Sequence, residues 1–370
     1  MPNYNNFLNL SSLQGKLKPI TCKSCRDDGL NTGTCAKCLK NQAWNKEYLE
    51  THPFVYDTEF RTYHYHGHDD FKSLPIRLKN EHPYLYYGIE LEIEFDQYLG
   101  QSNYDDYDEC YEYDSDRDRI LTKATEICPL FVYEADSSLD RGIEFISRPM
   151  SYAYMTAPKT IHMFKQLFEY LKSEGALVNQ PNGNGMHIHL SNKFFESGDT
   201  KLVDRREAYK GFDWLFTRFQ KQIELLGGRK YTGYCQSKLD QIKYDGSVSR
   251  LKTYYNADVK MEITIKKGGE VARSNHSCAV TMSGATIEAR VFKSTTDYKQ
   301  MLANVELVRN FAHAVRNNAI DGVSLNEILH TKDNLYLDKH IQAVRMASAK
   351  NKEVLDLNDI STDTISTEIK

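Results

Sequence analysis

Residues 84–95, YLYYGIELEIEF, alternate apolar and acidic side chains, and this stretch decides the fold. A period of two predicts a half-buried β-strand with Glu90, Glu92 and Glu94 projecting from one face. Like charges in a row repel one another unless a cation lies over them. The strand therefore favours a carboxylate surface that binds metal, and a solvated acidic face is the alternative.

The heptapeptide GMHIHLS, residues 185–191, follows a turn rich in glycine and asparagine and predicts a second strand. His187 and His189 point to one face, while the apolar residues between them enter the core. Two such imidazoles can bind a divalent cation, or one can bind metal while the other contacts phosphate. A pair of structural histidines with satisfied hydrogen bonds is the alternative.

Two further segments carry isolated carboxylates. Residues 131–149, FVYEADSSLDRGIEFISRP, predict strand, turn and strand, and the lone Glu144 among apolar residues is costly unless a cation pairs with it. In TIEARVF, residues 286–292, Glu288 and Arg290 share a face, which an ordinary ion pair would also explain. Carboxylates, imidazoles and arginines on one sheet face suit two or three Mg²⁺ or Mn²⁺ ions and a polyphosphate.

Helices complete the pattern. Apolar residues at helical spacing predict amphipathic helices over residues 160–175, 204–226 and 297–318, each with one face directed at a core. The apolar stripe of the middle helix is interpreted as core rather than as a cofactor site. Together with the strands, these helices predict an α+β fold.

Eight cysteines are unevenly distributed, and four of them form two CxxC pairs at Cys22, Cys25, Cys35 and Cys38. In a chain expected in a reducing compartment, this spacing is typical of a closed, structural zinc site. A redox pair or unrelated thiols are the alternatives. The remaining four are interpreted as small hydrophobic residues: Cys110, Cys128, Cys235 and Cys278.

Two polar segments carry weaker signals. His64, His66 and His68 could face one side of a strand as a metal site, but Gly67 and two aspartates favour a solvated loop. Residues 96–118 are acidic and tyrosine-rich without usable periodicity, which predicts a solvated insertion, with a lid or partner-binding loop as the alternative.

Composition excludes some function classes. The 370 residues carry a net charge of -4, which argues against general nucleic-acid binding, although a local basic patch stays open. No apolar stretch reaches the roughly 20 residues that cross a bilayer, and the N-terminus lacks the features of a signal peptide. We therefore expect a cytoplasmic protein, in the host cytoplasm if the source is viral.

In this order, the motifs GIELE, GIEFISRP, NGNGMHIHLS and TIEARVF resemble the amidoligase family, a branch of the glutamine synthetase and glutamate-cysteine ligase superfamily. The resemblance covers roughly residues 84–318, and GMHIHLS is its most specific element. It implies a mostly antiparallel sheet whose concave face holds metals and ATP, with helices on the outer face.

The resemblance also implies residue roles. The expected metal ligands are Glu90, Glu92, Glu144, His187 and Glu288. His189 is similar to a histidine that contacts nucleotide phosphate, and Arg290 to an arginine that stabilises the transferred phosphoryl group. Arg273 is a weaker match to an upstream arginine of the family, and Glu94 has no counterpart.

The implied activity is ATP-dependent formation of an amide or isopeptide bond, in which an amine attacks an acyl phosphate. The expected cofactors are ATP, Mg²⁺ or Mn²⁺, and a structural Zn²⁺. The expected partners are amine and carboxylate substrates, with a peptide or macromolecule recruited by the zinc knuckle as one option and nucleic acid not excluded. A metal-dependent hydrolase and a zinc-knuckle binding protein with a degenerate ligase fold stay open.

The predicted organisation has four parts. They are an N-terminal segment with the knuckle (1–45), an aromatic and histidine-rich connector (46–83), an amidoligase-like catalytic domain (84–320) and a partly disordered C-terminal extension (321–370).

Overall fold

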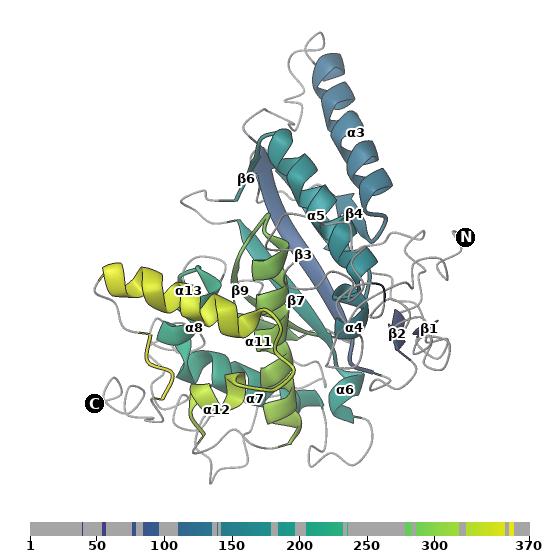
Figure 1. Cartoon of the computed structure of the whole chain (residues 1–370). Helices are drawn as coiled ribbons and strands as arrows, with labels where there is room; N and C mark the ends of the chain where they lie inside the picture. The colour runs from purple at the N-terminus through teal and green to yellow at the C-terminus, as the bar shows by residue number, and fades with distance from the viewer. Residues whose placement is uncertain are drawn as a thin grey trace, which may run out of the picture. The chain divides into compact units, whose positions relative to one another are not determined.

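This computed structural model describes residues 39, 54–56, 76–78, 84–95, 110–134, 139, 142–178, 184–196, 205–231, 235, 278–282, 286–317, 323–351 and 355–358 (Figure 1). They fall into two compact units, which are described separately. The first unit comprises the chain up to Asn184 with Ser294–Leu302 and Lys332–Leu335, and the second comprises the rest.

In its described part, the first unit combines antiparallel strands with helices. Its elements are β1 (Phe54–Tyr56), β2 (Ile76–Leu78), β3 (Tyr87–Phe95), α3 (Cys110–Ile127), β4 (Phe131–Glu134), β5 (Gly142–Ser147), α4 (Tyr152–Met155), α5 (Pro158–Ser173) and β6 (Ala176–Leu177). The strand order is β4-β5-β3, β6 pairs with β3, and β1 and β2 form a separate pair. All of these pairings are antiparallel, as predicted.

Helix α5 packs on the strands of this unit. Pro158 stands in its first turn, where a missing N–H costs no intrahelical bond. Gly175 follows the C-cap with φ of 84°, a conformation that favours glycine. The rings of Phe164 on α5 and Phe131 on β4 lie 5.9 Å apart, so that the apolar face of the helix meets the sheet.

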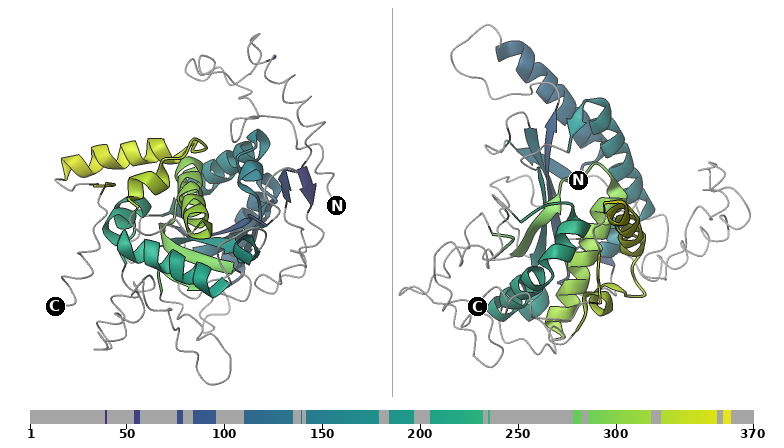
Figure 2. Two further views of the ribbon diagram at one scale, coloured as in Figure 1. Left: turned by 90° about the horizontal axis from the view of Figure 1, so that it is seen from below. Right: turned by 90° about the vertical axis from the view of Figure 1, so that its left-hand side faces the viewer.

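The described residues of the second unit combine strands with helices. Its elements are β7 (Gly185–Ser191), α6 (Lys193–Glu196), α7 (Arg205–Arg218), α8 (Gln220–Gly227), β8 (Val280–Met282), β9 (Thr286–Lys293), α11 (Tyr298–Arg316, from Ala303 on), α12 (Leu325–Leu329) and α13 (Leu337–Lys350). The strand order is β7-β9-β8, again antiparallel. Both views show α13 alongside α8 (Figures 1 and 2), where His340 Nε2 lies 2.7 Å from the carbonyl oxygen of Leu226.

Aromatic rings fill the core of the second unit. Phe212 and Phe216 of α7 are buried, and the ring of Phe216 lies 4.9 Å from that of Phe311 on α11. Phe195 of α6 meets Phe212 at 5.7 Å. The strands therefore rest on a rigid layer of helices, which fixes the positions of side chains on their polar face.

Two predicted elements differ from the structure. The helix expected over 204–226 is divided, because the backbone of Phe219 leaves helical geometry between α7 and α8, although Phe219 and Ile223 are buried as predicted. Residues 110–118, expected to be irregular, belong to α3. The apolar residues that anchor α3, Ile120 and Leu121, lie beyond the acidic segment, which explains why that segment alone shows no periodicity. The C-terminal extension contributes α12 and α13 to the second unit.

Within the described part of the chain, no helix is long and apolar enough to cross a membrane.

Candidate metal and anion site

The first unit places three predicted carboxylates on neighbouring strands. Glu90 and Glu92 lie on β3 and Glu144 on β5, with exposed fractions of 4%, 6% and 7%. Glu92 and Glu144 occupy directly opposite positions of the antiparallel register, so their side chains share a face. Glu94 lies opposite Gly142 and is half-buried.

Two buried carboxylates at opposite positions are unfavourable in the absence of positive charge. Opposite residues of an antiparallel pair bring their Cβ atoms to about 4.5–5.5 Å, and like charges at this distance destabilise the sheet. A divalent cation would offset the repulsion, and carboxylate oxygens are the hard ligands that Mg²⁺ prefers. The donor set of β3 and β5 therefore fits a divalent metal ion.

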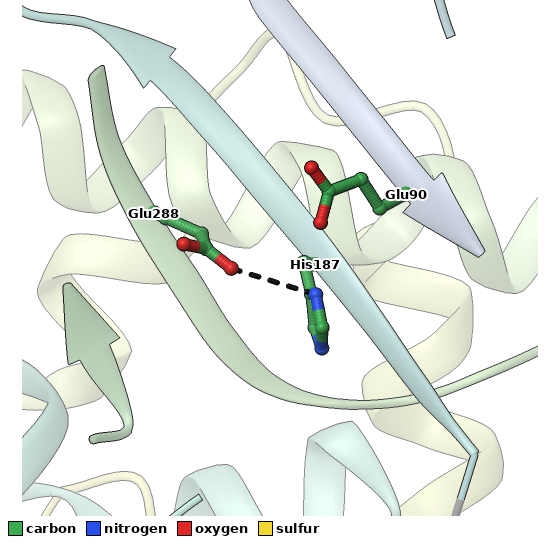
Figure 3. Close-up of side chains that lie close together, drawn as sticks. All are labelled: Glu90, His187 and Glu288. Carbon is green, nitrogen blue, oxygen red and sulfur yellow. Dashed lines mark ion pairs between the residues drawn. The ribbon is translucent and has the colours of Figure 1, made fainter. Parts of the chain in front are cut away.

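In the second unit, the carboxylate of Glu288 is the centre of a polar cluster. His187 Nδ1 lies 3.4 Å from Glu288 Oε1 (Figure 3), and His189 Nε2 lies 3.9 Å from the same oxygen. Arg290 Nη1 also contacts this oxygen, while the hydroxyl of Thr281 donates to Oε2 at 2.7 Å. One buried carboxylate thus meets two imidazoles, a guanidinium and a hydroxyl.

The register of β7 and β9 explains this convergence. His189 lies opposite Glu288, and the register shifts between Met186 and Ile188. As a result, His187 faces both Arg290 and Val291, the pattern of a β-bulge. Strand alternation places Glu288 and Arg290 on one face of β9 and the buried Ala289 and Val291 on the other.

Threonines support the cluster from the neighbouring positions. Thr286 Oγ1 lies 3.2 Å from His189 Nδ1, so this hydroxyl helps to orient the ring and leaves Nε2 on the side of Glu288. Thr281 lies opposite Glu288 across β8 and β9. Such outer partners fix the orientation and basicity of metal-binding side chains.

Sequence reasoning missed Thr281, Thr286 and Arg229, whose Nη1 donates to the Arg290 carbonyl oxygen at 3.2 Å. The three-residue β8 is too short for a periodic signal, and Arg229 follows a helix end. By contrast, Arg273, the four CxxC cysteines and the three connector histidines lie outside the described residues.

Three cysteines lie in the core of the described region. Cys128, Cys235 and Cys278 are buried and free, in keeping with their interpretation as small hydrophobic residues. Burial raises the pKa of Cys128 and of Cys235 to about 12, so both stay protonated at neutral pH. Chemistry that requires a thiolate is therefore not supported at these positions.

Carboxylates, imidazoles and arginines are the side chains from which proteins build sites for divalent cations and anions. The chain belongs to the amidoligase family, because the family described as "Putative amidoligase enzyme" matches residues 92–312, more than half of its length. The protein is accordingly a ligase that joins a carboxylate to an amine. Among proteins of curated function, none matches this chain in sequence.

Solved structures with similarity to this chain include ligases. A novel glutamine synthase homolog is 10% identical, with 78% of this chain and 71% of that chain covered and a TM-score of 0.36. Glutamine synthetase of Plasmodium falciparum is 14% identical, with 68% and 54% covered and a TM-score of 0.35. The ligase PafA, in complex with the prokaryotic ubiquitin-like protein Pup, is 12% identical, with 77% and 61% covered and a TM-score of 0.26.

The chain thus spans little more than half of the Plasmodium enzyme and about three fifths of PafA. At these TM-scores the superpositions support no further conclusion, and the family assignment rests on the sequence match.

Proposed function

We propose that this protein is an ATP- and Mg²⁺-dependent carboxylate–amine ligase that forms an amide or isopeptide bond through an acyl phosphate. The observation that carries the proposal is the buried Glu288 carboxylate, held between His187, His189 and Arg290. In a member of the amidoligase family, this arrangement combines a ligand for a divalent cation with a guanidinium for a phosphoryl group.

The proposed metal ligands are the five residues expected from the sequence. Their carboxylate oxygens and imidazole nitrogen are donor types that Mg²⁺ and Mn²⁺ take in proteins. Mg²⁺ or Mn²⁺ would supply charge neutralisation between phosphate oxygens and the substrate carboxylate when bound. All five side chains are buried, which keeps bulk water from competing for the ion.

The remaining residues are assigned to the anion. His189 would contact a nucleotide phosphate through Nε2, since Nδ1 is directed at Thr286. Arg290 would neutralise the phosphoryl group during transfer, because its guanidinium already lies at the Glu288 carboxylate. Arg273 is retained as a second candidate for this task on the family resemblance alone.

The chemistry needs activation because a carboxylate and an amine do not condense in water. Transfer of the terminal phosphoryl group of ATP to the substrate carboxylate forms the acyl phosphate and releases ADP. The amine then attacks the acyl carbon, and phosphate leaves. No covalent intermediate on the protein is required, which agrees with the buried, protonated thiols.

We further propose that Cys22, Cys25, Cys35 and Cys38 hold a structural zinc ion and that this knuckle helps to recruit the substrate, a peptide or another macromolecule. The amine and carboxylate substrates would then meet at the catalytic strands. We expect the enzyme to act in the cytoplasm.

Measurement of ATP turnover with Mg²⁺ tests the proposal, with amino acids, peptides and polyamines screened as acceptors. We expect ADP release that depends on one acceptor class and is abolished in Glu90→Ala and in His187→Ala. Lys165→Ala on the exposed surface of α5 is the control and should retain full turnover. Release of product from an amide substrate without ATP would instead establish a hydrolase, and absence of ATP binding would contradict the ligase proposal.

A further inference from the structure

The side chains of Arg229 and His187 both lie next to Gly185. A Cβ atom added to Gly185 would lie 2.2 Å from Arg229 Nη1 and 2.8 Å from His187 Nε2. Both side chains therefore pass over the same backbone position at the start of β7. A larger residue at position 185 would displace the guanidinium or the imidazole from its present position.

The backbone around Arg229 is fixed by close contact between the end of α8 and β9. Gly228 adopts a left-handed conformation with φ of 69° and bridges to Phe292. A Cβ atom on Gly227 would lie 2.7 Å from the carbonyl oxygen of Val291. Arg229 Nη1 then donates to the Arg290 carbonyl oxygen at 3.2 Å, which ties its guanidinium to the bulge of β9.

Two guanidinium groups lie at this cluster of the second unit. Arg290 Nη1 contacts the carboxylate of Glu288, whereas Arg229 Nη1 donates to a carbonyl oxygen. The charges of both arginines also act on the thiol of Cys235, so both guanidinium groups lie near the same buried position. A guanidinium has five N–H donors, and this carbonyl bond uses one of them.

We propose that Arg229 is a second anion-binding residue of the site, which holds phosphoryl oxygens of the nucleotide beside His187 together with Arg290. The inference rests on the proposed ligase function and adds a residue to it. A planar guanidinium recognises phosphate through two parallel hydrogen bonds. The carbonyl of Arg290 keeps the guanidinium in place before the ligand arrives, which reduces the entropy lost on binding.

Calorimetric binding of a non-hydrolysable ATP analogue and of AMP, each with Mg²⁺, tests this role in the full-length protein. We expect Arg229→Gln to weaken binding of the triphosphate about tenfold to a hundredfold and to leave AMP binding within twofold. Arg229→Lys should lie between, since it keeps the charge but loses the planar fork. Lys230→Gln removes the same charge one residue away, where Nζ pairs with Glu224 at the surface, and should match the wild type.

Gly185→Ala provides a second, independent variant. It keeps the charge of Arg229 but fills the space that the guanidinium occupies, so it should weaken triphosphate binding at least as much as Arg229→Gln. Urea unfolding of each variant separates loss of binding from loss of fold.

Triphosphate affinity that stays within twofold of wild type in Arg229→Gln would overturn the inference. The same holds if only the KM of the carboxylate substrate rises, because the anion at Arg229 would then be a carboxylate. Wild-type protein that binds no nucleotide contradicts the proposed ligase function itself, so the two failures are distinguishable.

Discussion

The carboxylates of the first unit and the cluster of the second unit use charge in different ways. Glu92 and Glu144 are buried opposite one another with the same charge. Glu288, equally buried, is surrounded by Arg290, Thr281 and two imidazoles. The structure shows which groups contact Glu288, and we expect the carboxylates of β3 and β5 to gain stability when a cation binds.

The comparison predicts opposite effects for the same chemical change, and the largest is expected at Glu288. Glu288→Gln removes the negative charge and leaves the half-buried Arg290 beside a neutral amide. Loss of a hydrogen bond between charged groups costs about 1–3 kcal/mol. Urea unfolding in EDTA should therefore show a clear loss of stability relative to wild type.

Arg290→Gln is the matched control, because it leaves Glu288 buried with the imidazoles and Thr281. It should lower stability in the same direction and by a similar amount. Unchanged stability in both variants would mean that the cluster is not organised by its own charges.

A smaller effect of opposite sign is expected at Glu144. Glu144→Gln removes the repulsion with Glu92, so the free energy of unfolding in EDTA should rise by about 1 kcal/mol. Addition of Mg²⁺ should stabilise the wild type but not this variant, because the variant lacks a ligand charge. Thermal unfolding with and without Mg²⁺ measures both effects.

Glu94→Gln on the same strand is the control for this comparison. Glu94 lies opposite Gly142 and is half-buried. The Glu94→Gln protein should therefore match the wild type in its stability in EDTA and in its response to Mg²⁺. A Glu144→Gln variant that is less stable than wild type in EDTA would show that the first unit is organised in the same way as the second.

Thr281→Val tests the outer partner of Glu288. The substitution keeps the shape of the side chain and removes the hydroxyl that donates to Oε2, which should cost about 1 kcal/mol of stability. Outer partners of this kind change metal affinity about tenfold to a hundredfold. Titration with Mn²⁺ measures the affinity, and an unchanged value would assign Thr281 to strand packing alone.

The sequence predicted the strands of the site better than its supporting residues. Alternation with period two located β3 and β7 and assigned Glu90, Glu92, His187 and His189 to shared faces, because a strand fixes which side chains share a side. Their metal-binding role stays a prediction.

The contacts of Thr281 and Arg229 could not be predicted from spacing. The first depends on the register of the three-residue β8 with β9, and the second on the close approach of α8 to β9, where Gly227 meets Val291. Likewise, the start of α3 could not be predicted, because it lies inside an acidic run and the buried apolar residues of the helix include Ile120 and Leu121, which follow that run. Tertiary contacts between distant segments carry this information, and local patterns do not.

The smallest effect is expected from thiol modification, which compares Cys128 of the first unit with Cys235 of the second. The pKa of each is raised to about 12 by burial, although Arg229 and Arg290 act against the shift at Cys235. At pH 8 about one thiol in ten thousand is ionised in each, against roughly one in ten for an ordinary cysteine.

Alkylation of the native protein with iodoacetamide at pH 8, followed by mass mapping, should therefore leave both thiols unmodified. Because the folded pKa is raised above the usual value of 9.0, the neutral thiols stabilise the fold below pH 9, and this contribution declines as the pH rises toward 12. Rapid labelling of Cys235 alone would mean that the two arginines outweigh burial, and that the second unit has a reactive thiol near its anion site.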